Sequence, residues 1–290
     1  MQIFSTPAEM QAWSDNCRTA GRRIGLVPTM GALHTGHLAL IADAAERSDD
    51  VVVSIFVNPL QFTEVSDFDG YPRPIDDDVA ACEQAGVAAV FAPTAASMYP
   101  MGFQTRVVPG PLGAVMEGPT RPGHLEGVLT VVVKLFGAVR PHVAIFGEKD
   151  YQQLRIITQM AADLEFGIDV VGHPIVRDLD GLALSSRNVH LTNTERAAAV
   201  AVPRSLDAAV VAARVGEDLT DTIRAATSVI GAEDAAVLEY VSVFDSITLI
   251  EFDDLASIPR VPGVARIATA VRFGDVRLID NRDLFESSKT

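Results

Sequence analysis

The sequence has few cysteines and no long apolar run. Only Cys17 and Cys82 occur in 290 residues, far apart and without a CxxC or His/Cys spacing. A disulfide framework or a cysteine-based zinc site is therefore not indicated, and a reducing compartment is expected. The first residues lack a basic segment followed by an apolar one, and no uncharged apolar run approaches the ~20 residues of a membrane-spanning helix. These absences predict a cytoplasmic protein with no membrane partner.

Basic residues are outnumbered by acidic ones. The chain has 23 Lys and Arg against 38 Asp and Glu, a formal net charge of -15. Proteins that neutralise nucleic-acid phosphates need a basic face, so extended binding to DNA or RNA is not expected. An acidic surface repels anionic substrates, so a phosphate site would need a local cluster of cations and main-chain N–H groups. The 48% hydrophobic and 21% charged composition is that of an ordinary globular protein.

Short β-branched runs alternate with segments of helical spacing. The runs begin at Ile24, Val51, Val87, Val143 and Val170. The segments with helical spacing are residues 36–47, 76–85, 127–139 and 150–166. The runs are apolar on both faces, as in strands covered by helices on both sides. This pattern predicts an α/β fold with a Rossmann-like, doubly wound parallel sheet, whose ligands bind at the carboxyl ends of the strands.

The last third of the sequence predicts a smaller unit. Residues 194–213 are rich in alanine and predict one helix, whose start is marked by Thr192 and Asn193. Two alternating runs meet at Gly274 and Asp275, which predicts a β-hairpin. We therefore predict a smaller C-terminal α+β lid domain. The predicted domains are residues 1–176 and 177–290, and the Pro/Gly-rich residues 109–123 predict a surface loop or flap in the first.

The segment VPTMGALHTGHLALI places His34 and His37 where a predicted strand ends and a predicted helix begins. Gly31 and Gly36 would let the backbone approach a phosphate, and a helix N-terminus offers N–H groups and a partial positive charge. Imidazole donors could stabilise the charge that develops on an α-phosphate. Two surface histidines, or half of a metal site, would give the same spacing. No third metal ligand is evident in the neighbouring sequence.

Two later segments also offer phosphate ligands. In VAIFGEKDYQQL, Gly147 and Lys149 follow a predicted buried strand, where a lysine could neutralise phosphate charge. In LALSSRN, Ser185, Ser186 and Arg187 could donate to phosphate oxygens from a mobile loop between domains. Taken alone, an ordinary charged helix start and a solvated turn would be the better explanations of these two segments.

The HxGH, GEKDYQQ and SSRN segments, in this order, resemble the pantothenate synthetase family. The resemblance extends over residues 20–195 through SIFVNPLQF, DFDGYPR (Asp67–Arg73), FAPTAASMYP and GHLEGVLTVVVKLF. It implies a Rossmann domain with a smaller lid, in a homodimer. It also implies an ATP-dependent ligase that condenses pantoate with β-alanine through pantoyl adenylate, releasing AMP and pyrophosphate. ATP would be a substrate, with Mg²⁺ carried on its phosphates.

The resemblance also implies roles for individual residues. The expected ATP ligands are Met30, Gly31, Ala32, Leu33, His34, Thr35, Gly36, His37, Gly147, Glu148, Lys149, Asp150, Val176, Leu184, Ser185, Ser186 and Arg187. The expected catalytic set is His34, His37, Lys149, Ser185, Ser186 and Arg187, with His37 the proton donor. Gln61 and Gln153 match the family's pantoate ligands, and their amides can hold a hydroxyl and a carboxylate without added charge.

Other residues carry weaker expectations. An apolar wall around the pantoate methyl groups is implied for Pro28, Met30, Phe56, Val131, Val132 and Phe146, each of which could equally be plain core. Leu184 and Leu125 replace the family's methionine and phenylalanine, which should alter affinity rather than remove chemistry. Asp76, Asp77 and Asp78 after Pro74 predict a helix N-cap rather than a magnesium site, so direct metal ligands stay unidentified. His124, His142, His173 and His190 share no catalytic spacing.

Two other functions compete with the ligase. Another HxGH-type nucleotidyltransferase would transfer a nucleotidyl group to a phosphorylated acceptor, but such a site would favour Arg or Lys where Gln61 and Gln153 are neutral. A noncatalytic nucleotide sensor or an RNA-binding synthetase relative is disfavoured by the net charge and by the set of phosphate ligands. The identity of the amine substrate depends on the resemblance alone.

Overall fold

The computed structural model describes residues 1–285 and, within them, every side chain except those of Val65 and Ser66. The chain divides into two compact units. The first unit consists of Met1–Glu148 and Gln152–Pro174, and the second of Lys149–Tyr151 and Ile175–Thr290. Three residues from the middle of the chain thus belong to the unit that is otherwise C-terminal.

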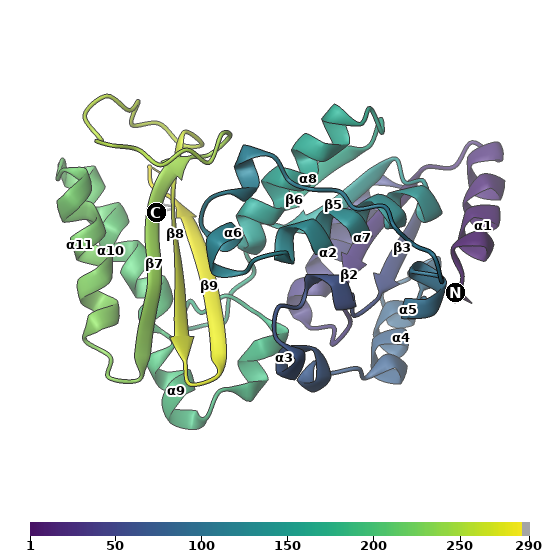
Figure 1. Cartoon of the computed structure of the whole chain (residues 1–290), viewed down its shortest axis with the longest axis horizontal. Coiled ribbons are helices and arrows are strands. Elements are labelled where there is room, and N and C mark those ends of the chain that lie inside the picture. Colours follow the sequence, from purple (N-terminus) through teal and green to yellow (C-terminus); the bar gives the residue numbers. More distant parts are fainter. Residues whose placement is uncertain (286–290) are drawn as a thin grey trace. The chain divides into compact units, whose positions relative to one another are not determined.

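A six-stranded parallel sheet forms the centre of the first unit (Figure 1), in the order β1-β4-β3-β2-β5-β6. The strands are β1 Gln2–Phe4, β2 Ile24–Thr29, β3 Asp50–Ile55, β4 Ala89–Phe91, β5 Val143–Gly147 and β6 Asp169–His173. This confirms the predicted Rossmann-like parallel sheet. Strand β1 was not predicted, because three residues are too few to show a period.

Helices connect these strands. The α-helices of the first part of the chain are α1 Pro7–Thr19, α2 Thr35–Arg47, α3 Val65–Gly70, α4 Ile75–Gln84, α5 Ala95–Met98, α6 Glu117–Thr120, α7 His124–Val139 and α8 Tyr151–Asp163. Short 3₁₀ turns are η1 Pro59–Gln61, η2 Pro111–Gly113 and η3 Glu148–Asp150. The four predicted crossover helices correspond to α2, α4, α7 and α8.

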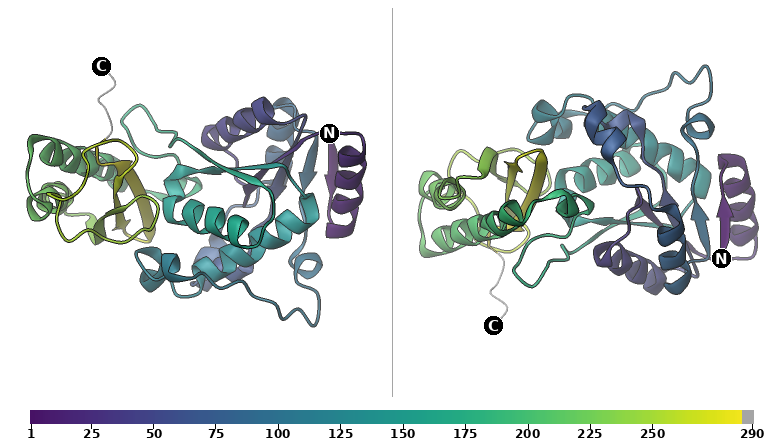
Figure 2. Two further views of the ribbon diagram at one scale, coloured as in Figure 1. Left: turned by 90° about the horizontal axis from the view of Figure 1, so that it is seen from above. Right: turned by 90° about the horizontal axis from the view of Figure 1, so that it is seen from below.

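Helices cover both faces of the parallel sheet (Figure 2), which explains why its strands are apolar throughout. On one face Val27, Val53 and Ile145 pack with Ile41 of α2. Gly25 of β2 faces the same way, and a Cβ atom there would lie 2.4 Å from Ser48 Oγ, so α2 approaches the sheet too closely for a side chain. On the other face α1 and α7 pack against each other and against β2.

The second unit is an antiparallel sheet, β7-β8-β9, with α10 and α11 packed against it (Figure 1). Its elements are η4 Ser186–His190, α9 Asn193–Ala198, α10 Ala201–Val215, α11 Leu219–Gly231, β7 Ala236–Asp245, β8 Ala265–Phe273 and β9 Val276–Asp283. The predicted hairpin is confirmed, since β8 and β9 are joined at Gly274 and Asp275. This small α+β arrangement agrees with the predicted fold class.

The prediction of one continuous helix over residues 194–213 is wrong, because the structure has two helices there, α9 and α10. Thr192 caps α9 as expected, accepting from Glu195 N at 3.3 Å. The break has a physical reason in Pro203, whose ring nitrogen has no proton to donate to the carbonyl of Ala199. Val202 N instead donates to Ala199 O at 3.0 Å, a tighter turn between the two helices.

Candidate functional site

The direction of strand succession reverses between β2 and β5. From β2 the sheet continues to β3 and β4 on one side, and to β5 and β6 on the other. In open α/β sheets, ligands bind beyond the carboxyl ends of the strands at such a point. Strand β2 ends at Thr29, directly before the HxGH segment, and β5 ends at Gly147. Two of the segments singled out in the sequence therefore follow adjacent strands at the expected binding edge.

His34 and His37 together cap the N-terminus of α2. His34 Nδ1 accepts a hydrogen bond from Gly36 N at 3.1 Å, and His37 Nδ1 accepts one from His34 N at 3.3 Å. The ring centroids are 4.1 Å apart. Because each Nδ1 is an acceptor, each neutral ring carries its proton on Nε2. The two histidines can thus present N–H donors of fixed tautomer at a helix N-terminus, which suits a phosphate.

The loop before His34 has an unusual backbone. Gly31 and Ala32 both have positive φ, of 86° and 52°. Asp78 of α4 fixes this loop, since its Oδ2 accepts from Ala32 N at 2.9 Å and its Oδ1 accepts from Leu33 N at 2.7 Å. The Asp78 residue is only 2% exposed. A side chain in place of Gly31 would meet that carboxylate, with its Cβ 2.8 Å from Oδ2.

The N-cap prediction for the three aspartates is wrong. The N-cap residue of α4 is Pro74, and Asp76, Asp77 and Asp78 lie in the first turn. Their position still favours the helix dipole, as expected. The buried Asp78 binds the HxGH loop instead, a contact that local sequence patterns do not predict because it joins residues 45 and 46 apart in the chain.

The Gln61 side-chain amide is held at both of its ends. Its Oε1 accepts from Asn58 Nδ2 at 3.0 Å, and its Nε2 contacts Met30 Sδ at 3.1 Å. Asn58 is buried and also accepts from Tyr99 Oη at 2.8 Å. Burial raises the pKa of Tyr99 well above its usual range, which keeps the hydroxyl a donor. These contacts orient Gln61 beside Met30, the first residue of the HxGH loop.

The His124 side chain contacts the main-chain carbonyl of Gln61. Its ring Nδ1 lies 2.7 Å from Gln61 O, and its Nε2 lies 3.0 Å from Arg121 Nη1. A carbonyl accepts and a guanidinium donates, so the ring is the neutral Nδ1–H tautomer. His124 is 7% exposed. No sequence spacing singles out this histidine, and the structure places it behind a predicted substrate ligand.

The two glutamines of the DYQQ segment have different surroundings. Gln152 is buried and holds the flap, donating to Leu112 O at 2.8 Å and to Val115 O at 2.9 Å and accepting from Glu117 N at 3.0 Å. Gln153, the predicted pantoate ligand, is half-buried on α8. The role of Gln152 was missed, because a contact between a helix and a distant Pro/Gly-rich loop leaves no local signal in the sequence.

The predicted apolar wall lies mostly in the interior of the first unit. Phe56, Val131, Val132 and Phe146 are buried, while Pro28 and Met30 are half-buried. Both cysteines are buried as well. Burial, with the nearby Asp78 charge, raises the pKa of the Cys82 thiol to about 11. Burial and the charge of Asp50 also raise the pKa of Cys17. Neither thiol is poised to act as a nucleophile.

Seven of the predicted ATP ligands belong to the second unit. Lys149 Nζ lies 3.6 Å from Asp150 Oδ2, and the Lys149 side chain is 20% exposed. Ser185 caps η4, with its Oγ accepting from Arg187 N at 3.3 Å. The second-unit residues of the predicted ATP set are Lys149, Asp150, Val176, Leu184, Ser185, Ser186 and Arg187, all half-buried.

The first unit holds the rest of that set. It carries residues 30–37, Gly147 and Glu148, together with Gln61 and Gln153. Within residues 1–285 no group of three or more His, Cys, Asp or Glu side chains is arranged to hold a metal ion. In the same part of the chain no helix combines the length and apolar character needed to cross a membrane.

Comparison with known proteins agrees with this architecture. The model of the pantoate-beta-alanine ligase family matches residues 2–283. The pantothenate synthetase of Mycolicibacterium smegmatis is 49% identical over 283 residues, which cover 97% of this chain and 87% of that protein. The crystal structure of the Thermus thermophilus enzyme has a TM-score of 0.92 at 44% identity, covering 99% of this chain and 100% of the other.

A third relative was solved with ligands. The pantoate-beta-alanine ligase from Francisella tularensis, complexed with beta-gamma ATP and beta-alanine, has a TM-score of 0.81 at 33% identity and covers 99% of both chains. The resemblance inferred from the HxGH, GEKDYQQ and SSRN segments is therefore confirmed. Matched almost from end to end by a family model and by proteins nearly half identical to it, the chain belongs to the pantoate–β-alanine ligase family.

Proposed function

We propose that this chain, as a pantoate–β-alanine ligase, works through a pantoyl adenylate. A carboxylate oxygen of pantoate attacks the α-phosphorus of ATP, the bond from that phosphorus to the β-phosphate bridge breaks, and pyrophosphate leaves. The amine nitrogen of β-alanine then attacks the acyl carbon, the bond to AMP breaks, and the nitrogen loses a proton as the amide forms. Positioning and charge stabilisation supply the catalysis, without a covalent bond to the protein.

One contact is the main support for a carboxylic acid as the group that receives the adenylate. Gln61 Nε2 lies 3.1 Å from Met30 Sδ, so a neutral amide is held directly beside the nucleotide-binding loop. An amide can bind a hydroxyl and a carboxylate together. A phosphorylated acceptor, which a nucleotidyltransferase would need, favours a cation at that place. Gln153 would supply the second amide for pantoate, and the apolar side chains around Phe56 and Phe146 would take its methyl groups.

His34 and His37 would act on the α-phosphate. Their Nε2–H groups are donors of fixed tautomer, because each Nδ1 accepts a main-chain hydrogen bond. Preorganised donors of this kind stabilise negative charge that grows in the transition state without reorganisation. His37 would be the proton donor. The main-chain N–H groups of the loop from Met30 and of the first turn of α2 would complete the contact with ATP.

The second unit would supply the β- and γ-phosphate ligands. Lys149 brings a positive charge, while Ser185, Ser186 and Arg187 bring hydroxyl and guanidinium donors. Val176 and Leu184 would pack near the adenine. In this scheme residues 177–290 act as a lid. The paired charge of Asp150, 3.6 Å from the Lys149 ammonium, would be exchanged for phosphate when ATP binds.

Three further properties accompany the proposal. Mg²⁺ would arrive as MgATP, since this ion binds readily through substrate phosphates with few protein ligands. The protein would be cytoplasmic and a homodimer, as the family resemblance implies. Light scattering coupled to size exclusion would give about twice the monomer mass for a dimer, whereas a monomer mass would overturn the dimer.

Release of AMP and pyrophosphate tests the reaction. Purified protein is incubated with MgATP and pantoate, with and without β-alanine. The proposal expects AMP only when both organic substrates are present, and a pantoate-dependent ATP–pyrophosphate exchange without the amine. Pyrophosphate release that requires a phosphorylated acceptor would identify a nucleotidyltransferase. Binding of ATP without any turnover would identify a sensor.

A further inference from the structure

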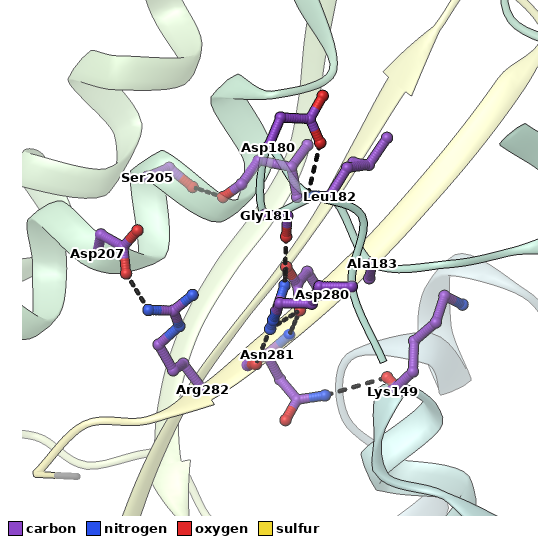
Figure 3. Close-up of polar contacts among 12 residues, drawn as sticks. Lys149, Asp180, Gly181, Leu182, Ala183, Ser205, Asp207, Asp280, Asn281 and Arg282 are labelled. Carbon is purple, nitrogen blue, oxygen red and sulfur yellow. Dashed lines mark hydrogen bonds and ion pairs between the residues drawn. The ribbon is translucent and has the colours of Figure 1, made fainter. Parts of the chain in front are cut away.

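Asn281 of β9 holds the main chain at Lys149 (Figure 3). Its Nδ2 donates to Lys149 O at 3.0 Å. Its Oδ1 accepts from a guanidinium nitrogen of Arg266. Asn281 is 3% exposed, so both ends of a buried amide are used. Lys149 and Arg266 are half-buried, and replacing Asn281 would cost free energy because each would lose a hydrogen bond to a buried amide. Sequence patterns indicate only a hairpin strand here.

Arg266 extends the same network to Tyr151. Its guanidinium carbon lies 4.0 Å from the centroid of the Tyr151 ring, a cation–π distance. The Tyr151 hydroxyl donates to Ser246 O at 2.9 Å. Lys149 and Tyr151 are thus both attached to the antiparallel sheet of the second unit. This attachment explains why these three residues group with that unit although their chain neighbours belong to the other.

Asp280, the preceding residue of β9, anchors a second segment. Its side chain is 1% exposed and forms two hydrogen bonds with the Arg177 guanidinium, of 2.7 and 2.9 Å. Arg177 also donates to Gly181 O at 3.0 Å. A bidentate pair of this kind fixes orientation as well as distance. Asp280 thereby holds the turn that begins at Arg177.

That turn leads directly to the SSRN segment. Arg177 and Ala183 form a β-bridge, and Leu184 N donates to Val176 O at 2.9 Å, so the chain returns beside itself just before Ser185. The 3₁₀ turn η4, which contains Ser186 and Arg187, packs against β9. Adjacent residues of one strand therefore hold the two segments that carry the expected phosphate ligands of this unit.

We propose that Asp280 and Asn281 are positioning residues for ATP binding. They act through Arg177 and the Lys149 main chain to keep Lys149 and the Ser185–Arg187 hydroxyl and guanidinium donors on one rigid frame. A preformed arrangement binds phosphate better, because ligand binding does not have to order the side chains first. This inference rests on the proposed function in one respect, namely that these residues bind ATP phosphates.

The test compares MgATP binding by two variants, one substituted on β9 itself and one substituted on α10 at a residue that pairs with β9. Asn281→Leu keeps the approximate shape and the net charge but removes the donor to Lys149 O. Asp207→Asn is the matched control, because Asp207 pairs with Arg282, the next residue of β9, and touches neither segment (Figure 3). We expect Asn281→Leu to raise the dissociation constant and the KM for MgATP at least tenfold, with the pantoate KM within twofold. For Asp207→Asn, the MgATP dissociation constant, the MgATP KM and the pantoate KM should all stay within twofold of wild type.

A double substitution separates positioning from a general loss of stability. If Asn281 acts through Lys149, its replacement should cost little more once the lysine is gone, so Lys149→Ala and the double variant should bind MgATP within threefold of each other. An Asn281→Leu variant that raises the MgATP and pantoate constants equally, or neither, overturns the inference.

If the Asn281→Leu variant does not fold, Tyr151→Phe decides in its place. It keeps the ring under Arg266, loses the hydrogen bond to Ser246, and should raise the MgATP constant about threefold. An unchanged constant there also overturns the inference.

The same measurements keep the two proposals apart. Wild-type protein that binds MgATP but does not adenylate pantoate defeats the proposed function, and the dissociation constants of the variants still decide the positioning role. Wild-type protein that adenylates pantoate, with Asn281→Leu binding MgATP as well as wild type, defeats only the positioning role. Wild-type protein that does not bind MgATP defeats both.

Discussion

Asp78 Oδ1 accepts a hydrogen bond of 2.7 Å from Leu33 N, and so fixes the loop that leads into the two histidines. We predict that Asp78→Asn destabilises the protein by roughly 1.5–3 kcal/mol, because one carboxylate oxygen becomes an amide that faces a main-chain donor. MgATP turnover should fall at least tenfold. Urea denaturation and pyrophosphate release measure the two effects. Asp77→Asn, an exposed neighbour in the same helical turn, is the control and should change stability by less than about 1 kcal/mol. Equal effects of the two substitutions would contradict the role of Asp78.

The capping and phosphate-binding roles of His34 can be separated. In His34→Asn the side-chain oxygen can still accept from Gly36 N, since asparagine is a preferred N-cap residue, but the Nε2 donor is lost. We expect a thermal midpoint close to that of wild type and an adenylation rate lower by roughly 10²–10³-fold. His34→Ala should lose the cap as well, at a cost of about 1 kcal/mol. If His34→Asn turned over within a few fold of wild type, His34 would have no part in phosphate binding.

Gly127 of α7 lies against the 3₁₀ turn that carries Gln61. A Cβ atom at Gly127 would be 2.2 Å from Leu60 O and 2.6 Å from Gln61 N. Gly127→Ala should therefore destabilise the protein by roughly 1–3 kcal/mol through overpacking and raise the pantoate KM by displacing Gln61.

Gly137 on the same helix provides the matched control for that substitution. Nothing lies within 4 Å of a Cβ atom built there, so Gly137→Ala should stabilise the protein by about 0.5–1 kcal/mol and leave the KM unchanged. Steady-state kinetics with pantoate varied, together with thermal melts, distinguish the two variants. A normal pantoate KM in a folded Gly127→Ala protein would show that Gln61 does not bind pantoate.

His142 makes stability depend on pH. Burial, helped by the positive charges of Arg18 and Arg23, lowers its pKa, and its Nδ1 accepts from Ile24 N at 2.9 Å. Because the folded pKa lies below the ordinary value of about 6.5, the stabilisation is complete above that pH and is lost as pH falls through the folded pKa. His142→Asn keeps an acceptor for Ile24 but does not titrate. Urea midpoints measured from pH 7.5 to pH 5 should fall less steeply for this variant, and parallel curves would contradict the assignment.

Local patterns predicted the parts of this fold that depend on local physics. The alternation of β-branched runs with helical segments predicted the sheet because each strand is covered on both faces, and the turn at Gly274 predicted the hairpin of β8 and β9. The break between α9 and α10 could have been predicted too, since Pro203 lies inside the expected helix. Strand β1 could not, because its pairing with β4 depends on residues almost ninety positions away.

In the candidate site, too, local sequence predicted the expected ligand residues but not the residues that support them. The histidines, Lys149 and the paired serines follow strand ends or precede helical turns, where sequence spacing has meaning. Their supports come from distant parts of the chain, as Asp78 does for the loop and Asn281 does for Lys149. No periodicity or short motif connects residues 132 positions apart, so these supports became visible only in the folded chain.

Lys149–Tyr151 group with the second unit, and this affects how the polypeptide can be cut into independent fragments. A fragment that starts at residue 175 contains Asn281, Arg266 and Ser246 but lacks the carbonyl, the ring and the hydroxyl that they bind in the intact chain. Cutting the polypeptide at the obvious connection therefore removes a structural part of the smaller unit. A stable independent version would need the stretch around Lys149 grafted back, for example through a circular permutation.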